Sequence, residues 1–190
     1  MYRWLVLFFV YAMISETVSS IFHELNWNNW ALLHVYDLIS VSLFVPILVK
    51  WGHMSAKLKW LAYTGTCAFV LWYFNFLVVQ QNWLKVQTVQ WLFIAPWMCF
   101  WSLMFMRKLL QADDVNFRSF EFLWAFGVLF YHSAAYFNEV MDEMLITRNL
   151  LSPQYRIFQP VVNIVTNGIF CYAFICLKKN SLRMSPLVAA

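Results

Sequence analysis

Six long runs of hydrophobic residues follow one another along the chain, separated by short polar stretches. Each run is about 20 residues long, and as an α-helix it would cross the hydrocarbon core of a bilayer, which is about 30 Å thick. The runs predict helices at about residues 2–21, 30–49, 58–79, 89–106, 120–140 and 157–177. The pattern therefore predicts an all-α, polytopic transmembrane bundle. We expect one six-helix domain over residues 1–177 and a short basic tail over residues 178–190.

The composition supports a location in the membrane. Of the 190 residues, 63% are hydrophobic and 12% are charged, whereas soluble domains are about 45–50% apolar and about 25% charged. The net charge of +4 does not indicate nucleic-acid binding, because the basic residues lie at the ends of the hydrophobic runs and not in one patch. The expected surroundings are the lipid bilayer of the cell (inner) membrane, with no nucleic-acid partner.

Lysine and arginine are distributed unequally between the two sides of the predicted bundle. Ten of the thirteen basic residues fall on the side that carries both ends of the chain, including Lys50, Lys57 and Lys59 in one loop. Basic residues are enriched in cytoplasmic loops, so both termini are predicted to be cytoplasmic.

The first hydrophobic run has two interpretations. Arg3 precedes it and small residues follow it, as in a secretory signal peptide cleaved after Ser20. Glu16 fits poorly with a signal peptide, and on a retained helix Glu16, Ser20 and His23 would share one face. We favour an uncleaved first helix.

The second run contains the clearest candidates for function, His34 and Asp37. They lie three residues apart, so they share one face of a helix. An ionisable side chain at the centre of a membrane costs on the order of 2.5–3.5 kcal/mol, and such groups usually face a partner or a cavity. Both side chains are therefore expected to point into the bundle.

Polar residues of other runs are predicted to reach a similar depth, in the outer half of the membrane. His132, Tyr136 and Glu139 share a face of the fifth run, and Asn163 and Asn167 are four residues apart in the sixth. The fourth run has no polar stripe and is expected to lie towards the lipid. The predicted ligand-binding residues are Glu16, His34, Asp37, His132, Tyr136, Glu139, Asn163 and Asn167.

These residues support three functional hypotheses. The leading one is a non-enzymatic protein whose polar site, open to the outside, binds a small polar molecule, a cation or protons. The same groups would also serve as interhelical hydrogen bonds that hold the bundle together. A small-solute or proton-coupled transporter is a further alternative, and self-association into a homo-oligomer stays open.

A membrane-embedded, metal-dependent hydrolase is the second hypothesis, because imidazole and carboxylate groups ligate zinc and iron. Glu16, Ser20, His23 and Asp37 resemble the polar set of alkaline ceramidases. That family has seven helices and an HxxxH pair in the last one, where this chain has asparagines. No catalytic residue, metal or cofactor is assigned.

Three stretches resemble a known family. NNWALLHVYDLI, FEFLWAFGVLFYHSAAYF and VVNIVTNGIFCYAF lie in the second, fifth and sixth runs. They are similar to segments of uncharacterised six-helix membrane proteins of Bacteroidota, often encoded beside signalling histidine kinases. That family has a glutamate further along the second helix. This chain departs from the pattern, with Asp37 earlier in the helix and Ser40 and Ser42 after it. The resemblance implies a sensory or accessory role and a membrane or signalling protein as partner.

Overall fold

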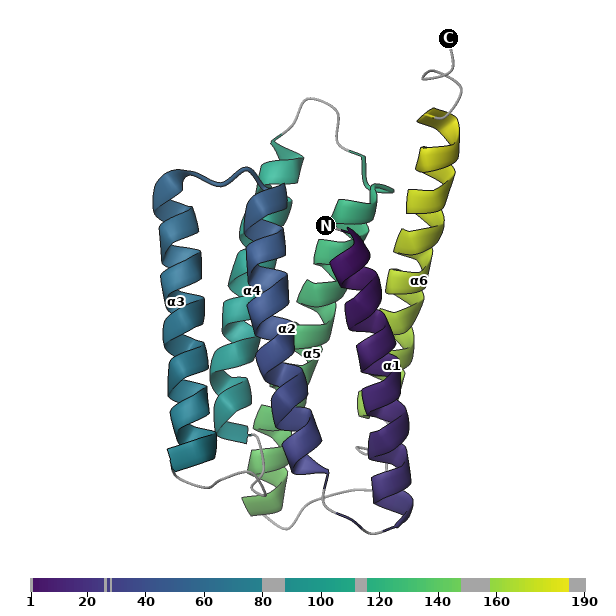
Figure 1. Cartoon of the computed structure of the whole chain (residues 1–190). Coiled ribbons are helices and arrows are strands. Elements are labelled where there is room, and N and C mark those ends of the chain that lie inside the picture. The colour runs from purple at the N-terminus through teal and green to yellow at the C-terminus, as the bar shows by residue number, and fades with distance from the viewer. Residues whose placement is uncertain are drawn as a thin grey trace. The chain divides into compact units, whose positions relative to one another are not determined.

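The chain is all-α over the residues that its structure, a computed structural model, describes. These are residues 2–25, 27, 29–79, 88–111, 116–147 and 158–184. The elements are α1 (Tyr2–Glu24), α2 (Trp30–Trp51), α3 (Ala56–Phe74), the π-helix η1 (Asn75–Val79), α4 (Thr88–Leu110), α5 (Phe120–Thr147) and α6 (Phe158–Met184) (Figure 1). The described residues confirm the prediction of an all-α chain with six long helices at about the expected positions.

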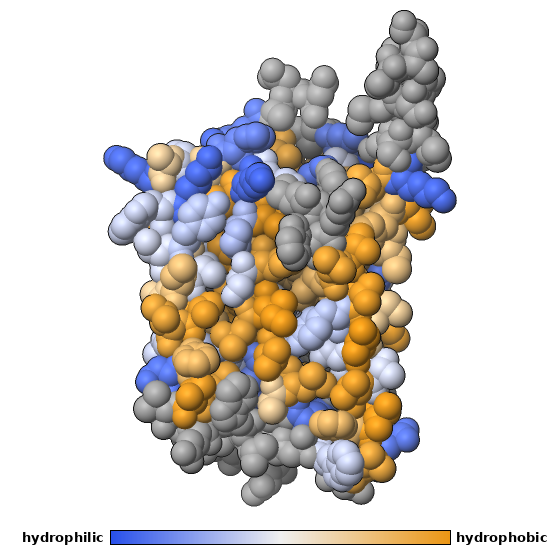
Figure 2. All heavy atoms as spheres, viewed as in Figure 1, coloured by the Kyte–Doolittle hydropathy of each residue, from blue (hydrophilic) through white to orange (hydrophobic). Residues whose placement is uncertain are grey.

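Four helices contain segments long and apolar enough to cross a membrane. They are Ala31–Trp51, Ala56–Val78, Leu92–Leu110 and Pro160–Lys178. The apolar stretch of α1 is shorter, Leu5–Ser19, and α5 is interrupted by histidine, asparagine and acidic residues. Figure 2 shows hydrophobic side chains over the middle of the visible helices and hydrophilic ones near their ends. These features support a membrane protein with several spanning helices.

Capping motifs mark two of the helix boundaries, the start of α5 and the end of α2. The Phe122 N–H donates to the Ser119 hydroxyl at 3.1 Å, which caps the start of α5. After α2, the Met54 N–H donates to the Val49 carbonyl at 3.5 Å, and His53 between them has a φ of 43°. This is the Schellman arrangement, in which a residue in the left-handed conformation ends a helix.

The helices fall into two compact units, which we describe separately. Unit 1 comprises Met1–Lys50 and Met54–Gln90, and therefore holds α1, α2, α3 and η1. Unit 2 comprises Trp51–His53 and Trp91–Ala190, with α5, α6 and most of α4.

In unit 1, α2 lies between α1 and α3 (Figure 1). Phe8 packs edge-on against Phe44 with ring centroids 4.7 Å apart, and Tyr11 stacks on Tyr36 at 6.3 Å. These two pairs show that α1 and α2 run antiparallel. Such aromatic pairs stabilise contacts by about 0.5–1.5 kcal/mol beyond their buried area.

In unit 2, α5 and α6 pack antiparallel through aromatic rings. Trp124 and Phe170 have centroids 4.7 Å apart, and Phe137 and Phe158 lie 6.0 Å apart near the other ends of the helices. Gly127 lies under the Phe170 ring: a Cβ atom added to Gly127 would come within 2.6 Å of it. The missing side chain therefore makes room for the ring.

The expectation that the fourth run lies towards the lipid is only partly correct. Phe93 and Leu103 of α4 are exposed, but Trp101 and Phe105 are fully buried. A helix can thus bury one aromatic face without any polar stripe to mark it, because packing of rings and not hydrogen bonding holds that face.

Candidate functional site

The best-defined polar contact of unit 1 joins α2 to α3. His34 and Tyr73 are both 0% exposed, and His34 Nδ1 lies 2.6 Å from Tyr73 Oη. With the imidazole proton on Nε2, the Tyr73 hydroxyl donates to Nδ1; in the other tautomer, Nδ1–H donates to the hydroxyl oxygen. In either case the hydrogen bond ties the two helices together inside the protein.

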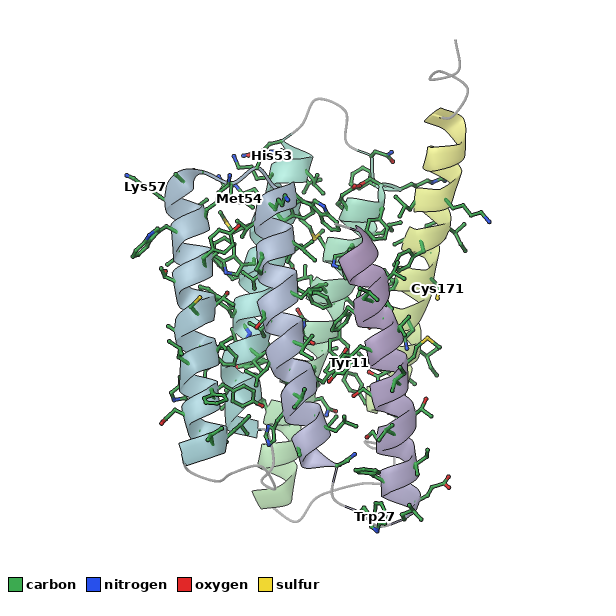
Figure 3. The ribbon with its side chains drawn as sticks, in the orientation of Figure 1. Tyr11, Trp27, His53, Met54, Lys57 and Cys171 are labelled. Carbon is green, nitrogen blue, oxygen red and sulfur yellow. The ribbon has the colours of Figure 1, made fainter. Side chains whose placement is uncertain are left out.

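Asp37 lies one turn after His34 on α2 and is 3% exposed. On α1, the Tyr11 hydroxyl lies beside Ser15 and within electrostatic range of the Asp37 carboxylate. The Tyr11 oxygen is buried, yet it makes no well-formed hydrogen bond among the described residues. Figure 3 shows Tyr11 near the middle of α1. Tyr11, Ser15, His34, Asp37 and Tyr73 are called the N-terminal polar cluster below.

Two serine hydroxyl groups near the cluster make hydrogen bonds elsewhere, one within α2 and one at the end of α1. Ser40 is buried, and its hydroxyl donates to the Tyr36 carbonyl at 2.8 Å within α2. The Asn29 side-chain amide, just before α2, donates to the Ser19 hydroxyl of α1 at 2.6 Å. This second bond fixes the ends of α1 and α2 near the cluster.

Unit 2 also contains buried polar side chains. His132 on α5 is 4% exposed, and Thr166 on α6 is also buried. The antiparallel pairing of α5 with α6 places His132 at the level of Asn163 and Thr166. Cys99 on α4 lies 3.3 Å from Ser133, the residue after His132, so α4 also contacts this part of α5.

The predicted site residues are divided between the two units. His34 and Asp37 are buried one turn apart on α2, as expected for both side chains, and His132 is buried as well. Asn163 is half-buried, whereas Tyr136 is 38% exposed and Asn167 is exposed. The side chains of Glu16 and Glu139 lie outside the described part of the chain.

Sequence reasoning missed three members of the cluster: Tyr11, Ser15 and Tyr73. A signal was present, because Tyr11 and Ser15 are four residues apart, and Tyr73 follows the buried Thr66 by seven. Both spacings place residues on one helix face. In a chain that is 21% aromatic, however, a tyrosine does not stand out from the rings that only pack.

Metal ligation gains no support from the described side chains, among which no three His, Cys, Asp or Glu are grouped to hold an ion. Three of the four members of the set proposed for a hydrolase, Glu16, Ser20 and His23, lie outside the described side chains. No protein-family model, curated protein or solved structure matches the chain. The class of protein therefore rests on its helices: an all-α protein with several candidate transmembrane segments.

Proposed function

We propose that this protein is a non-enzymatic, multi-pass membrane protein that binds a small polar ligand at the N-terminal polar cluster. The observation that carries the proposal is the burial of His34 and Asp37 side by side on a helix apolar enough to cross a membrane. Ionisable groups at such depth are costly, and neutral residues suffice for hydrogen bonding between helices. A ligand or a proton at the site accounts for keeping both.

The proposed topology has six spans and both termini in the cytoplasm of the cell (inner) membrane. Besides the four segments apolar enough to cross, α1 and α5 have 23 and 28 residues. At a rise of about 1.5 Å per residue, both exceed the thickness of a bilayer core of about 30 Å. In this topology the N-terminal polar cluster lies in the outer half of the membrane, where an external ligand has the shorter path.

The proposed role is that of a sensor or accessory subunit, coupled to another membrane or signalling protein. The resemblance of α2, α5 and α6 to proteins encoded beside histidine kinases supports this role. Ligand binding between α1, α2 and α3 would then be transmitted through changes in how these helices pack.

The substitution Asp37→Asn tests the function, because asparagine keeps the shape and most of the hydrogen-bonding capacity but loses the charge. A carboxylate that only packs helices would tolerate the change, since hydrogen bonds in membranes average about 0.6 kcal/mol. We expect instead a larger change in melting temperature, varying between about pH 5 and pH 8, where histidine changes its charge.

The control is Glu24→Gln at the exposed end of α1, which makes the same change of charge outside the cluster. Melting curves are recorded with a panel of cationic, neutral and anionic small molecules. The proposal is refuted if the melting temperatures of wild type and Asp37→Asn respond identically to every compound across the whole pH range. Asp37 would then be a purely structural residue.

A further inference from the structure

The charge of Asp37 within the N-terminal polar cluster restricts which ligands can bind there. Asp37 is buried, whereas the described lysines of unit 1, Lys50, Lys57 and Lys59, are exposed. His34, one turn before Asp37 on α2, contacts Tyr73 through Nδ1. An anion brought beside Asp37 would meet a like charge in a medium of low dielectric constant, so the site favours a cation.

The cluster also offers several hydrogen-bond acceptors in one place. Tyr11 and Ser15 of α1 and Asp37 of α2 together present two hydroxyl oxygens and a carboxylate. The Tyr11 oxygen is buried beside Ser15 and makes no hydrogen bond of good geometry among the described residues, so it can accept one from a further donor. A primary ammonium group has three donors, one for each of these acceptors.

Aromatic rings line the same part of α1 and α2. Tyr36 stacks on Tyr11 with centroids 6.3 Å apart and lies 5.6 Å from Phe8, which itself packs on Phe44. Ring faces attract cations within about 6 Å and also pack against alkyl groups. A bare hard metal ion, by contrast, prefers about six or more oxygen ligands, a fuller shell than these three residues present.

We infer that the N-terminal polar cluster recognises small primary amines in their ammonium form. Asp37 supplies the opposite charge, Tyr11 and Ser15 accept hydrogen bonds, and the rings of Tyr36 and Phe8 pack against the short alkyl part. This inference rests on the proposed function, because it names the ligand class of the same site.

Ethylammonium chloride is a suitable probe, titrated into the purified full chain in detergent with sodium chloride at equal ionic strength as the reference. The melting temperature of the wild type is expected to rise with ethylammonium and not with sodium. Asp37→Asn is expected to raise the apparent Kd about tenfold or more, because an ionic hydrogen-bond partner is lost.

A second variant tests amine binding without changing the charge of Asp37. Tyr11→Phe keeps the ring that stacks on Tyr36 and removes only the buried hydroxyl, so we expect a folded protein with an apparent Kd about three- to tenfold higher. Tyr63→Phe and Glu24→Gln make the same chemical changes at exposed positions and should leave the Kd unchanged.

Three results would each overturn the inference. The melting temperature of the wild type could rise equally with sodium and ethylammonium, or not rise with ethylammonium at all. Asp37→Asn could also respond to ethylammonium as strongly as the wild type does. If the wild type instead responds to a neutral or anionic compound, and Asp37→Asn does not, the amine is wrong but the proposed function stands. If no compound separates the two proteins at any pH, both fail.

Discussion

At the scale of single residues, the contact between Tyr73 and His34 has the clearest expected effect on stability. Tyr73→Phe keeps the ring but leaves a buried imidazole nitrogen without its partner hydroxyl. The free energy of unfolding should fall by about 1 kcal/mol, between the average for membrane hydrogen bonds and the cost of an unsatisfied buried group. Denaturant titration in detergent measures the change.

Tyr63→Phe is the matched control for that substitution, because Tyr63 lies on the same helix but is exposed. It should change the free energy of unfolding little. Equal losses for the two variants would mean that the hydroxyl of Tyr73 contributes nothing specific to the packing of α3 against α2.

His53 offers a test in the opposite direction, towards greater stability. Its φ of 43° is a left-handed conformation that costs a side chain roughly 1–2 kcal/mol and that glycine adopts freely. His53→Gly should therefore raise the free energy of unfolding by up to about 1 kcal/mol, after subtracting the greater flexibility of glycine when unfolded. His53→Ala keeps the steric conflict and should not raise the free energy of unfolding. Equal effects of the two substitutions would show that the left-handed conformation of His53 does not destabilise the protein.

The sequence predicted ionisable members of the candidate site better than neutral ones. His34 and Asp37 stand out because their cost in a membrane demands burial, and both are buried. Tyr11 and Tyr73 have amphipathic side chains that suit a core, a lipid boundary or a polar site equally well. Only the packing of α1 and α3 against α2 reveals which of these applies.

At the scale of helices, Gly127 makes the packing of α5 against α6 testable. A Cβ atom there would come within 2.6 Å of Phe170, a ring already packed on Trp124. Gly127→Ala should therefore destabilise the protein by about 1–3 kcal/mol, as overpacking does, despite the better helix propensity of alanine. The free energy of unfolding in detergent is the measurement.

Gly168→Ala is the control on α6, because a Cβ atom at Gly168 meets nothing within 4 Å. It should be neutral or slightly stabilising. If the two alanine variants unfold alike, the close approach of α5 and α6 at Gly127 does not occur in the membrane protein.

The hydrophobic runs predicted the helices well but not their ends. α6 continues past Lys178 to Met184, and α5 continues to Thr147, because charged and polar residues outside a bilayer are compatible with a helix. The runs therefore mark the part of each helix that suits lipid. The π-helix η1 was not predicted, since no residue type in Asn75–Val79 demands that conformation.

At the scale of the whole molecule, the distribution of basic residues predicts how the chain crosses the membrane. Reporter fusions at Lys85 and near Arg148, two positions outside the described residues, should report an external location, and fusions at both termini a cytoplasmic one. An internal signal at Lys85 or Arg148 would overturn the proposed topology. It would also remove the argument that the N-terminal polar cluster is reached from outside.

The sequence also predicted that polar residues of several helices reach one depth, but it did not predict how these residues divide between two compact units. His34 and Asp37 belong to unit 1, whereas His132 and Asn163 belong to unit 2. Each unit buries polar groups of its own. The packing of neighbouring helices depends on how side chains such as Gly127 and Phe170 fit together. The pattern of hydrophobic residues does not predict that fit.

The π-helix η1 is a position after α3 where the chain can lose a residue without disturbing the rest of the helix. A π turn holds one residue more than an α turn, so the loss of one residue within Asn75–Val79 would restore an α-helix and leave Tyr73 in position. A deletion between Thr66 and Tyr73 would instead turn Tyr73 about 100° away from His34. Length variation among descendants of this chain should therefore collect after Tyr73 and spare the stretch before it.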